Sequence, residues 1–443
     1  MFTKISGFSG GVHPEESKEL TAELPIETIP LPKTVIIPLS QHIGKPALPL
    51  VKKGAVVQKG EVIAEMQGVV SVPVHASVSG TVTKINVNPH LSGSPKEAIE
   101  ITASEEQTEV KMDPLDPGKI NADEIRERIK MAGLVGQGGA AFPTYVKLSP
   151  PPDKKIDLLI INAAECEPYL TRDYRLIIER TSDFITGVKL LMKAAGVEKG
   201  IIGIEDNKPK AIEMLRKALS SEKSITLAVA KTKYPQGAEK MLIYVATGRK
   251  VPPGKLPMDV GVIVQNVGTS VAVFDAIVNG LPQTTATITV TGRGIKNPKN
   301  LIVPVGTQIK TVLEHCGGLT EDAAKVIAGG PMMGIPQYEL NAPVLKATSG
   351  LLILNKKEAR KSDQTACLRC GKCIDVCPLN LLPTKLARLS QLEKYEDAEA
   401  LGVTVCMECG SCAFECPANI PLVQWIKLGK QQVFKIQRAR QKA

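Results

Sequence analysis

The sequence predicts a multidomain α/β protein whose last quarter is helical and rich in cysteine. Three observations support this fold class: short β runs alternate with turns over residues 30–103, strands alternate with helices over residues 119–282, and a run of four cysteines occurs twice after residue 366. At 443 residues the chain is long enough for roughly three to four domains. An apolar fraction of 43% is sufficient to form their cores.

The composition argues against several classes of protein. The net charge is +10, but aromatic residues make up only 3%; nucleic-acid surfaces combine both, so we expect no nucleic-acid partner. The longest apolar stretch, residues 261–281, is interrupted by Gln265 and Asp275, so we expect no transmembrane segment. The N-terminal residues lack the apolar core of a signal peptide, and Cys166 and Cys316 are isolated from other cysteines. These features favour a reducing, cytoplasmic location.

The N-terminal unit is predicted to be a β domain. Its clearest strands span residues 35–39, 56–64 and 79–85. Residues 53–82 resemble the barrel-sandwich hybrid of biotinyl and lipoyl carrier domains, which present a modifiable lysine at a hairpin tip. Residues 65–71 contain no lysine, so we expect a docking or spacing domain. Residues 1–28 are predicted to be extended or loop, and residues 104–119 to be a polar, proline-containing linker.

A parallel α/β unit follows the linker. It opens with a helix for which Asn121 is the expected N-cap, and Glu124 three residues on completes a capping box. Residues 156–161 are a continuous apolar run of strand length, which is typical of a buried parallel strand. The alternation continues with a helix from about 173, a strand at 200–204, a helix from 209 and a strand at 225–229.

A glycine-rich loop and three polar side chains of this unit form a candidate cofactor site. The loop contains Gly133, Gly136, Gly138 and Gly139. Without Cβ atoms its backbone N–H groups can approach an anion closely, and Lys147 could add a positive charge to the same phosphate. The polar residues that follow the strand at 156–161 are Asn162, Glu165 and Glu167. Ligands of open α/β sheets lie beyond the carboxyl ends of the strands, so the combination favours a cofactor site. The alternative for a single acid such as Glu167 is that it stabilises the start of a helix.

The next unit is again rich in β-structure. Residues 284–291 alternate with period two, residues 300–307 form a second strand, and residues 311–318 read as a short helix that ends at glycine. Residues 329–334 form a tight glycine-containing loop that could face a cofactor.

The doubled cysteine run has the spacing C-x2-C-x2-C-x3-C-P. The two runs are Cys367, Cys370, Cys373, Cys377 and Cys406, Cys409, Cys412, Cys416. In two-cluster ferredoxins the fourth cysteine of such a run ligates the other cluster. We therefore expect Cys367, Cys370, Cys373 and Cys416 to hold one [4Fe–4S] cluster. Cys406, Cys409, Cys412 and Cys377 are expected to hold the second. Structural zinc and disulfides remain as less favoured alternatives.

The glycine loop, residues 162–168 and residues 234–239 together resemble the flavin- and NADH-binding subunit of respiratory complex I. The resemblance is closer to the RnfC family, the C subunits of the Rnf complex, because complex I's subunit lacks the hybrid domain and the doubled run. The Rnf complex is a membrane-bound ferredoxin:NAD oxidoreductase that pumps Na⁺ or H⁺. The resemblance covers essentially the whole chain.

The resemblance implies four domains. They are a barrel-sandwich hybrid with an N-terminal extension (1–110), a Rossmann-like FMN/NADH-binding α/β domain (119–282), a β-grasp (SLBB-type) ligand-binding domain (283–355) and an α-helical ferredoxin-like domain with two [4Fe–4S] clusters (356–443).

The resemblance also implies roles for single residues. Noncovalent FMN would be bound by Gly133, Gly136, Gly138, Gly139, Ala140, Phe142, Lys147, Asn162, Glu165, Tyr234, Gly237, Asn266 and Thr269. Tyr234 would cover the ring face, and Glu167 and Glu239 would border the nicotinamide site as catalytic residues. The chain departs from the complex I pattern at Val135 and Gln137, where arginines occur in that subunit.

The function implied is hydride exchange between NAD(H) and FMN, followed by single-electron transfer through the two clusters. The expected partners are the other subunits of the Rnf membrane complex, including a ferredoxin-type iron–sulfur subunit, and the expected location is peripheral, on the cytoplasmic side of the inner membrane. Two alternatives remain open. One is an electron-transfer adapter that does not bind NADH itself, and the other is an iron–sulfur subunit of a quinone- or heterodisulfide-type reductase.

Overall fold

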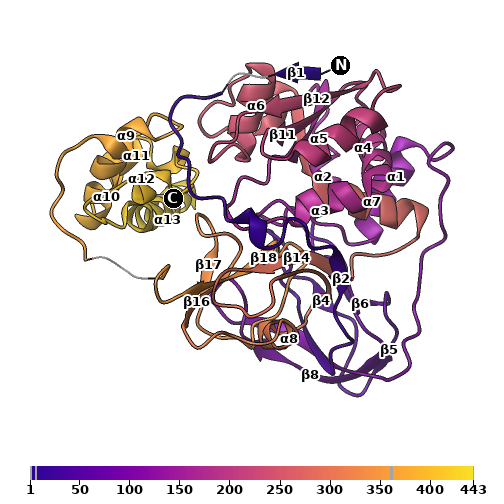
Figure 1. The fold of residues 1–443 in the computed structure, drawn as a ribbon. Helices are drawn as coiled ribbons and strands as arrows, with labels where there is room; N and C mark the ends of the chain where they lie inside the picture. The colour runs from indigo at the N-terminus through magenta and orange to yellow at the C-terminus, as the bar shows by residue number, and fades with distance from the viewer. Residues whose placement is uncertain (1, 5–6, 360–362, 443) are drawn as a thin grey trace.

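The fold comes from a computed structural model, which describes residues 2–4, 7–359 and 363–442. Figure 1 shows an α/β part at the top, β-sheets below it and a helical C-terminal part to one side. This arrangement confirms the predicted mixed α/β, multidomain fold class.

A five-stranded parallel sheet forms the centre of the α/β part. Its strands are β1 (Phe2–Lys4), β10 (Leu158–Ala163), β11 (Gly200–Glu205), β12 (Ile225–Ala230) and β13 (Val262–Asn266). They lie in the order β1-β12-β11-β10-β13. Asn162 and Asn266 are paired at the ends of β10 and β13. Because the strands are parallel, their carboxyl ends share one edge, and that edge carries the candidate site.

Helices bury both faces of this sheet. They are α1 (Ala122–Met131), α2 (Thr144–Lys147), α3 (Arg172–Glu179), α4 (Thr181–Ala195), α5 (Pro209–Ala218), α6 (Glu239–Thr247) and α7 (Val267–Val278), with the 3-10 turn η2 (Pro257–Val260). Leu159 and Ile161 pack with α1, α4 and α7, whereas Leu158 and Ile160 pack with α6. Successive residues of a strand point to opposite faces, which explains the uninterrupted apolar run. The predicted capping box of Asn121 and Glu124 is present.

The N-terminal β part consists of two small sheets. The first contains β3 (Thr34–Pro38), β9 (Lys96–Ala103), β8 (Gly80–Asn88) and β5 (Val56–Val57), and the second contains β4 (Leu48–Pro49), β6 (Val62–Glu65) and β7 (Val74–His75). The prediction of one strand over residues 56–64 is wrong, because β5 and β6 belong to different sheets. Gly60 breaks the run with φ 88°, and a Cβ there would lie 2.1 Å from the Val110 carbonyl oxygen.

A six-stranded mixed sheet forms the third part. Its strands, in spatial order, are β17 (Ile335–Gln337), β16 (Ala323–Ala328), β18 (Gly350–Asn355), β14 (Thr285–Thr291), β15 (Lys299–Pro304) and β2 (Ile26–Thr28). The helix α8 (Ile309–His315) packs into its core through Ile309, Val312 and Leu313. The strands and helix predicted between residues 284 and 318 are therefore confirmed.

The N-terminal segment connects the parts of the molecule. Residues 1–28 were predicted to be extended or loop, but β1 pairs with β12 of the α/β sheet and β2 pairs with β15 of the mixed sheet. The short 3-10 turn η1 (Lys18–Leu20) lies between them. Figure 1 shows this segment, in dark blue, passing the helical C-terminal part on its way. Sequence periodicity did not reveal these strands because each is only three residues long.

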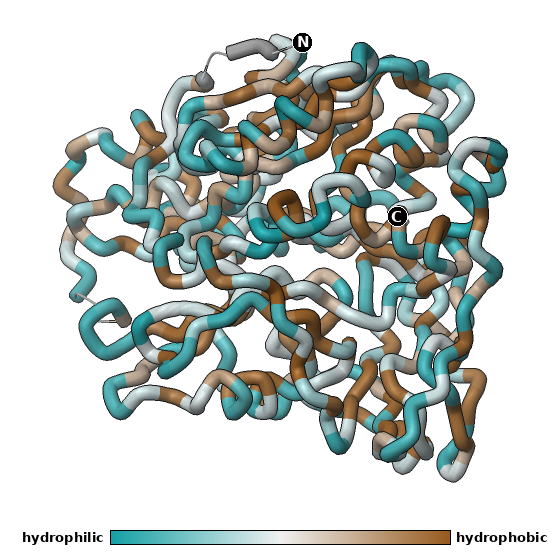
Figure 2. The backbone as a smooth tube through the Cα atoms, turned by 45° about the vertical axis from the view of Figure 1, so that its right-hand side comes forward, coloured by the Kyte–Doolittle hydropathy of each residue, from teal (hydrophilic) through white to brown (hydrophobic). Residues whose placement is uncertain are grey.

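The C-terminal part is helical, as predicted. Its elements are α9 (Lys372–Asp375), α10 (Pro383–Gln391), α11 (Tyr395–Ala400), η3 (Val403–Val405), α12 (Ser411–Phe414) and α13 (Leu422–Lys442). Leu386, Leu422 and Ile426 lie in its core. Figure 2 shows hydrophilic and hydrophobic stretches alternating along the backbone. Among the described residues, no helix combines the length and apolar character needed to cross a membrane.

Candidate functional site

The glycine-rich loop is closed at its base by backbone pairing. Gly136 N–H donates to the Phe142 carbonyl at 2.8 Å, and Thr144 N–H donates to the Leu134 carbonyl at 3.0 Å. Between these bonds Gly138, Gly139 and Ala140 are exposed. Gly139 has φ 139°, a backbone conformation open essentially to glycine alone. The loop therefore presents free backbone at its tip while its base stays fixed.

The loop rests on the N-terminus of α7. The Asn266 side chain accepts a hydrogen bond from Gly268 N–H at 2.8 Å, and the Thr269 hydroxyl accepts one from Gln137 N–H at 3.0 Å. A Cβ on Gly138 would lie 3.2 Å from the Cβ of Asn266, so only a small residue fits this approach. The structure thus brings together three predicted residues, Gly138, Asn266 and Thr269, at a helix N-terminus that favours anions.

A buried arginine that the sequence analysis did not identify holds this loop. The Arg172 guanidinium donates to the Gln137 carbonyl, to the Thr287 carbonyl at 3.1 Å and to the Thr348 carbonyl at 2.9 Å. Arg172 is 2% exposed, so the three bonds lie in the interior. The adjacent acid Asp173 accepts from Asn266 Nδ2 at 2.7 Å. The sequence signal that could have identified Arg172 is its pairing with the adjacent Asp173, shortly after the end of a predicted strand.

Asn162 and Gly237, both predicted to bind the cofactor, lie together at the end of β10. Asn162 Nδ2 donates to the Gly237 carbonyl at 2.7 Å, and Gly237 N–H donates to the Cys166 thiol at 3.1 Å. A Cβ on Gly237 would lie 3.0 Å from that sulfur, which explains the glycine. Cys166, which appeared isolated in the sequence, is therefore part of the same edge.

Glu165 caps the helix that follows it. Its carboxylate accepts from Asp173 N–H at 2.7 Å and from Tyr174 N–H at 3.3 Å, in the first turn of α3. Its backbone has φ 45°, and Lys18 Nζ binds its carbonyl at 2.9 Å. Lys18 also binds the carbonyls of Glu167 and Leu170. Desolvation raises the pKa of Glu165, and the Lys18 ammonium opposes that rise.

Glu167 binds the loop at 329–334 of the mixed-sheet part. Its two carboxylate oxygens accept from Met332 N–H at 3.1 Å and from Met333 N–H at 2.9 Å. A Cβ on Gly330 would lie 2.2 Å from Oε2, so this approach requires glycine. Desolvation raises the pKa of Glu167 to about 7, and the two N–H donors oppose the rise. The loop at 329–334 thus contacts the residues that follow β10 through Glu167.

Lys147 and Glu239 form an ion pair at 2.8 Å, and Lys147 also donates to the Val264 carbonyl at 3.0 Å. Both side chains are about one third exposed, at 33% and 37%. Glu239 is the first residue of α6, where a carboxylate interacts favourably with the helix dipole.

Tyr234 contacts the cysteine-rich part of the chain. Its hydroxyl donates to the Cys409 carbonyl at 2.7 Å, and the residue is 2% exposed. The tyrosine predicted to cover a flavin ring therefore contacts the cysteine-rich part of the chain, and its hydroxyl also lies beside the Glu167 carboxylate.

Several buried polar atoms near this edge have no hydrogen-bond partner among the described residues. They are Thr144 Oγ1, Gln236 Nε2, Gln265 Nε2 and Asp173 Oδ1, of which the last lies 3.5 Å from Arg172 Nε as an ion pair. Thr144 closes the glycine loop, Asp173 binds Asn266, and Gln265 precedes Asn266 on β13. Buried polar groups are normally satisfied, so orphaned donors and acceptors of this kind fit a polar ligand. The exposed loop tip, the α7 N-terminus and these atoms together fit a phosphate-bearing flavin.

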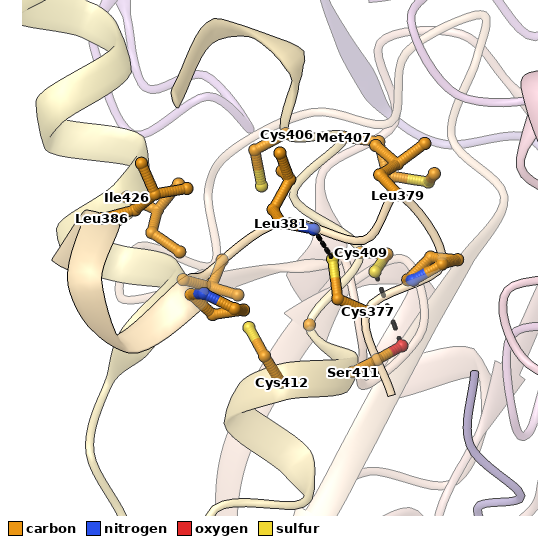
Figure 3. A pocket seen from close by; sticks show the side chains of 14 residues that line it. Cys377, Leu379, Leu381, Leu386, Cys406, Met407, Cys409, Ser411, Cys412 and Ile426 are labelled. Atoms are coloured by element: carbon orange, nitrogen blue, oxygen red, sulfur yellow. Dashed lines mark hydrogen bonds between the residues drawn. The ribbon is translucent and has the colours of Figure 1, made fainter. Parts of the chain in front are cut away.

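Four cysteines of the helical part line one cavity, and we call them the inner set: Cys377, Cys406, Cys409 and Cys412. Figure 3 shows them around the pocket with Leu381, Leu386 and Ile426. The fourth cysteine of the first run thus lies with the first three of the second, which agrees with the crossed assignment. Burial raises the pKa of the Cys406 thiol to about 11 and raises that of Cys412 further. Thiols in such a place become thiolates on binding iron, so the donor set fits a cluster.

The two runs have the same local backbone. Arg369 and Glu408, each two residues after the first cysteine, have φ 54° and 61°. Their N–H groups donate to Cys367 Sγ and Cys406 Sγ, both at 3.4 Å. N–H···S bonds of this kind tune iron–sulfur clusters, and their repetition indicates two equivalent sites.

The remaining cysteines, which we call the outer set, are Cys367, Cys370, Cys373 and Cys416. Cys367 and Cys370 are exposed, whereas the inner set is largely buried. Cys373 Sγ lies 2.9 Å from the Thr384 hydroxyl. Within the described ranges, no three His, Cys, Asp or Glu side chains are grouped closely enough to hold a single metal ion.

Comparison with known families assigns a domain type to each of the four parts. Residues 6–106 match the RnfC barrel sandwich hybrid domain, and residues 129–275 match the Nuo51 FMN-binding domain. Residues 287–336 match the SLBB domain, and residues 359–417 match a 4Fe-4S dicluster domain. These matches confirm the predicted sequence of domain types and the predicted FMN and iron–sulfur cofactors.

Several curated proteins are similar over nearly the whole chain. The C subunit of the proton-translocating ferredoxin:NAD(+) oxidoreductase complex of Clostridium ljungdahlii is 46% identical over 89% of this chain and 87% of its own length. The C subunit of the Na(+)-translocating complex of Acetobacterium woodii is 45% identical over 99% of both chains. Among solved structures, an NAD+-reducing [NiFe]-hydrogenase in its H2-reduced state aligns with a TM-score of 0.51 at 20% identity, over 72% of this chain and 63% of that one, which shows a shared fold.

Proposed function

The chain belongs to the family of C subunits of ion-translocating ferredoxin:NAD(+) oxidoreductase complexes, and on this premise we propose that it couples NAD(H) to one-electron carriers. NADH gives up two electrons as a hydride, whereas each [4Fe–4S] cluster accepts one. A bound flavin can exchange two electrons with NAD(H) and single electrons with a cluster, so it supplies the chemistry that links the two. Oxidation of one NADH to NAD⁺ and H⁺ would therefore supply one electron to each of the two clusters.

One observation carries this proposal: the inner cysteine set is in direct contact, within one chain, with the site at the end of β10 where Asn162 and Gly237 lie, which we call the strand-end site. Tyr234 lies three residues before Gly237 of the strand-end site and binds the Cys409 carbonyl of the inner set. Electron transfer requires such proximity, and a chain with separate flavin and cluster modules would not need it.

The residues of the site would divide the work. The backbone of Gly138, Gly139 and Ala140, with the α7 N-terminus, would bind the FMN phosphate, and Lys147 would add positive charge. Asn162 would hydrogen-bond the flavin. Glu167 and Glu239 would border the nicotinamide, and Glu167 would also hold the 329–334 loop beside it.

Further site residues and the domain boundaries belong to the same proposal. The additional cofactor-binding residues are Gly133, Gly136, Phe142, Glu165, Tyr234, Gly237, Asn266 and Thr269. The domains would span residues 1–110, 119–282, 283–355 and 356–443. We place the chain at the cytoplasmic face of the inner membrane, bound to the membrane subunits and to a ferredoxin-type iron–sulfur subunit.

Anaerobic purification followed by iron, sulfide and flavin analysis tests the function. We expect about eight iron atoms and about one FMN per chain. Addition of NADH should bleach the flavin absorbance and produce the EPR signals of reduced clusters. Iron without flavin would favour an iron–sulfur subunit of another reductase. Bound flavin that NADH fails to bleach would favour an adapter that does not bind NADH.

A further inference from the structure

A single buried hydrogen bond joins the flavin-type domain to the inner cysteine set. The Tyr234 hydroxyl donates to the carbonyl oxygen of Cys409 at 2.7 Å, across 175 residues of sequence. Tyr234 is 2% exposed and Cys409 is 8% exposed, so water cannot readily replace the bond. Removal of the hydroxyl would leave this carbonyl without that donor in the interior.

The backbone of Tyr234 is fixed by the N-terminal segment. Tyr234 and Val12 exchange two backbone hydrogen bonds, at 2.8 and 2.9 Å. The residue before Val12, Gly11, donates its N–H to the Val376 carbonyl at 2.8 Å, next to Cys377. A Cβ on Gly10 would lie 2.9 Å from the Cys377 carbonyl carbon. The segment therefore ties Tyr234 to a second residue of the inner set.

A third path of contacts reaches the same place from Glu167. Its carboxylate binds the N–H groups of Met332 and Met333. The Met332 carbonyl in turn lies against Gly410, where a Cβ would approach to 2.9 Å. Gly410 follows Cys409 directly, so Glu167, Met332 and Cys409 form with Tyr234 a closed ring of contacts.

These contacts reach only one of the two cysteine sets. Val12, Tyr234 and Cys409 form a small buried cluster against which Cys166 and Val376 pack. In the outer set, by contrast, Cys367 and Cys370 are exposed. The inner set is therefore the one that faces the strand-end site, while Cys367 and Cys370 of the outer set lie at the molecular surface.

We propose that Tyr234 is a positioning residue for electron exchange, whose buried hydroxyl holds the Cys409 loop and thereby the inner cluster site against the flavin domain. This inference rests on the proposed function. The O–H group points its positive end at the Cys409 carbonyl, so it should favour the reduced, more negative state of a cluster bound there. The inner cluster is then the first to exchange electrons with the flavin, and the outer cluster faces external partners.

The variant Tyr234→Phe tests this proposal in the anaerobically purified holoprotein. It removes only the hydroxyl and keeps the ring. Because one buried neutral hydrogen bond is lost, the reduction equilibrium of the inner cluster should weaken roughly three- to tenfold. At 59 mV per tenfold change for one electron, the midpoint potential should fall by about 28–59 mV. The measurement is an EPR-monitored redox titration, with the inner signal identified as the one lost in Cys412→Ser.

Tyr174→Phe is the matched control. Tyr174 is also largely buried in the α/β part, at 8% exposure, but its hydroxyl meets Glu23 at 3.4 Å. Removal of the Tyr174 hydroxyl should leave the midpoint potentials of both clusters unchanged. The NADH-driven rate of inner-cluster reduction should fall in Tyr234→Phe and not in this control.

Two results would overturn the proposal. The first is an unchanged midpoint potential of the inner cluster in Tyr234→Phe protein that has its full iron and flavin content. The second is a loss of iron from Tyr234→Phe while the inner cluster that remains has the same midpoint potential as in the unaltered protein. Should Tyr234→Phe fail to fold, replacement of tyrosine by 3-fluorotyrosine keeps the size and strengthens the donor, and the inner potential must then rise. If the unaltered holoprotein shows no NADH-driven cluster reduction at all, the proposed function itself fails, which is a separate outcome.

Order of reduction gives an independent readout. Cys370→Ser should leave the inner cluster reducible by NADH, whereas Cys412→Ser should stop NADH, but not dithionite, from rapidly reducing the outer cluster. Loss of NADH-driven inner reduction in Cys370→Ser would reverse the assigned order.

Discussion

The ammonium group of Lys147 lies 2.8 Å from the Glu239 carboxylate, although 92 residues separate them in the sequence. The pair links the end of the glycine-loop region to the first turn of α6. Since both side chains are about one third exposed, the pair itself should contribute no more than about 1 kcal/mol to stability. The proposed role of the pair is therefore in ligand binding, which the following substitution tests.

Replacement of Lys147 by Met should weaken FMN binding roughly tenfold or more, because a charge-assisted hydrogen bond is worth about 1.5–3 kcal/mol. The FMN dissociation constant of the apoprotein measures this. Lys130→Met is the control, since Lys130 forms a similar pair with Glu127 on α1. Equal FMN retention in both variants would show that Lys147 does not contact the phosphate.

Glu167 should make stability depend on pH. Desolvation raises its pKa from 4.5 to about 7 in the folded protein, so folding favours the protonated form. Its contribution is fully present below pH 4.5 and is lost as the pH rises towards 7, by at most about 3 kcal/mol. The melting temperature of Glu167→Gln relative to the unaltered protein should therefore increase between pH 5 and pH 8. A difference that stays constant over this range would mean that Glu167 is ionised throughout.

Arg172→Met should destabilise the protein by about 3 kcal/mol or more, because it leaves buried carbonyls of Gln137, Thr287 and Thr348 without their donor. FMN retention should fall with it, since the glycine loop loses its anchor. Arg172→Lys should not restore stability, because one ammonium group cannot reproduce the guanidinium fork. Arg249→Met serves as control: its pair with Asp157 is exposed, and thermal unfolding should change little.

Cys377→Ser should affect the cluster of the other run. If the ligands are crossed, Cys377→Ser and Cys412→Ser abolish the same EPR signal, and Cys373→Ser abolishes the other. Each variant should lose about half of the iron. If Cys377→Ser and Cys373→Ser instead abolished the same EPR signal, each run would bind its own cluster.

Much of the fold was predictable from local patterns. The apolar run that became β10, the capping box of Asn121 and the helices between the two cysteine runs each depend on residues a few positions apart. The doubled cysteine spacing is equally local, because a cluster needs ligands at fixed separations. The glycine loop and the asparagine at the end of β10 were recognisable for the same reason.

Other features depend on residues that are distant in sequence. Lys18 binds carbonyls about 150 positions away, and Glu167 binds the backbone of Met332 and Met333. Arg172 was overlooked because charged residues at helix starts are usually exposed. The β-strands of the N-terminal segment were missed because they are short edge strands that gain their stability from pairing.

The sequence by itself therefore determined the cysteine spacing and the iron–sulfur ligation that it predicts, since ligand spacing is a property of short segments. The domain types and the flavin were implied by the resemblance of its motifs to a known family. Only the tertiary structure decided that Tyr234 meets Cys409, that the inner set is largely buried and that Cys367 and Cys370 of the outer set are exposed. The physical reason is that such contacts form when separate domains pack together, and packing between surfaces leaves no periodic signal along the chain.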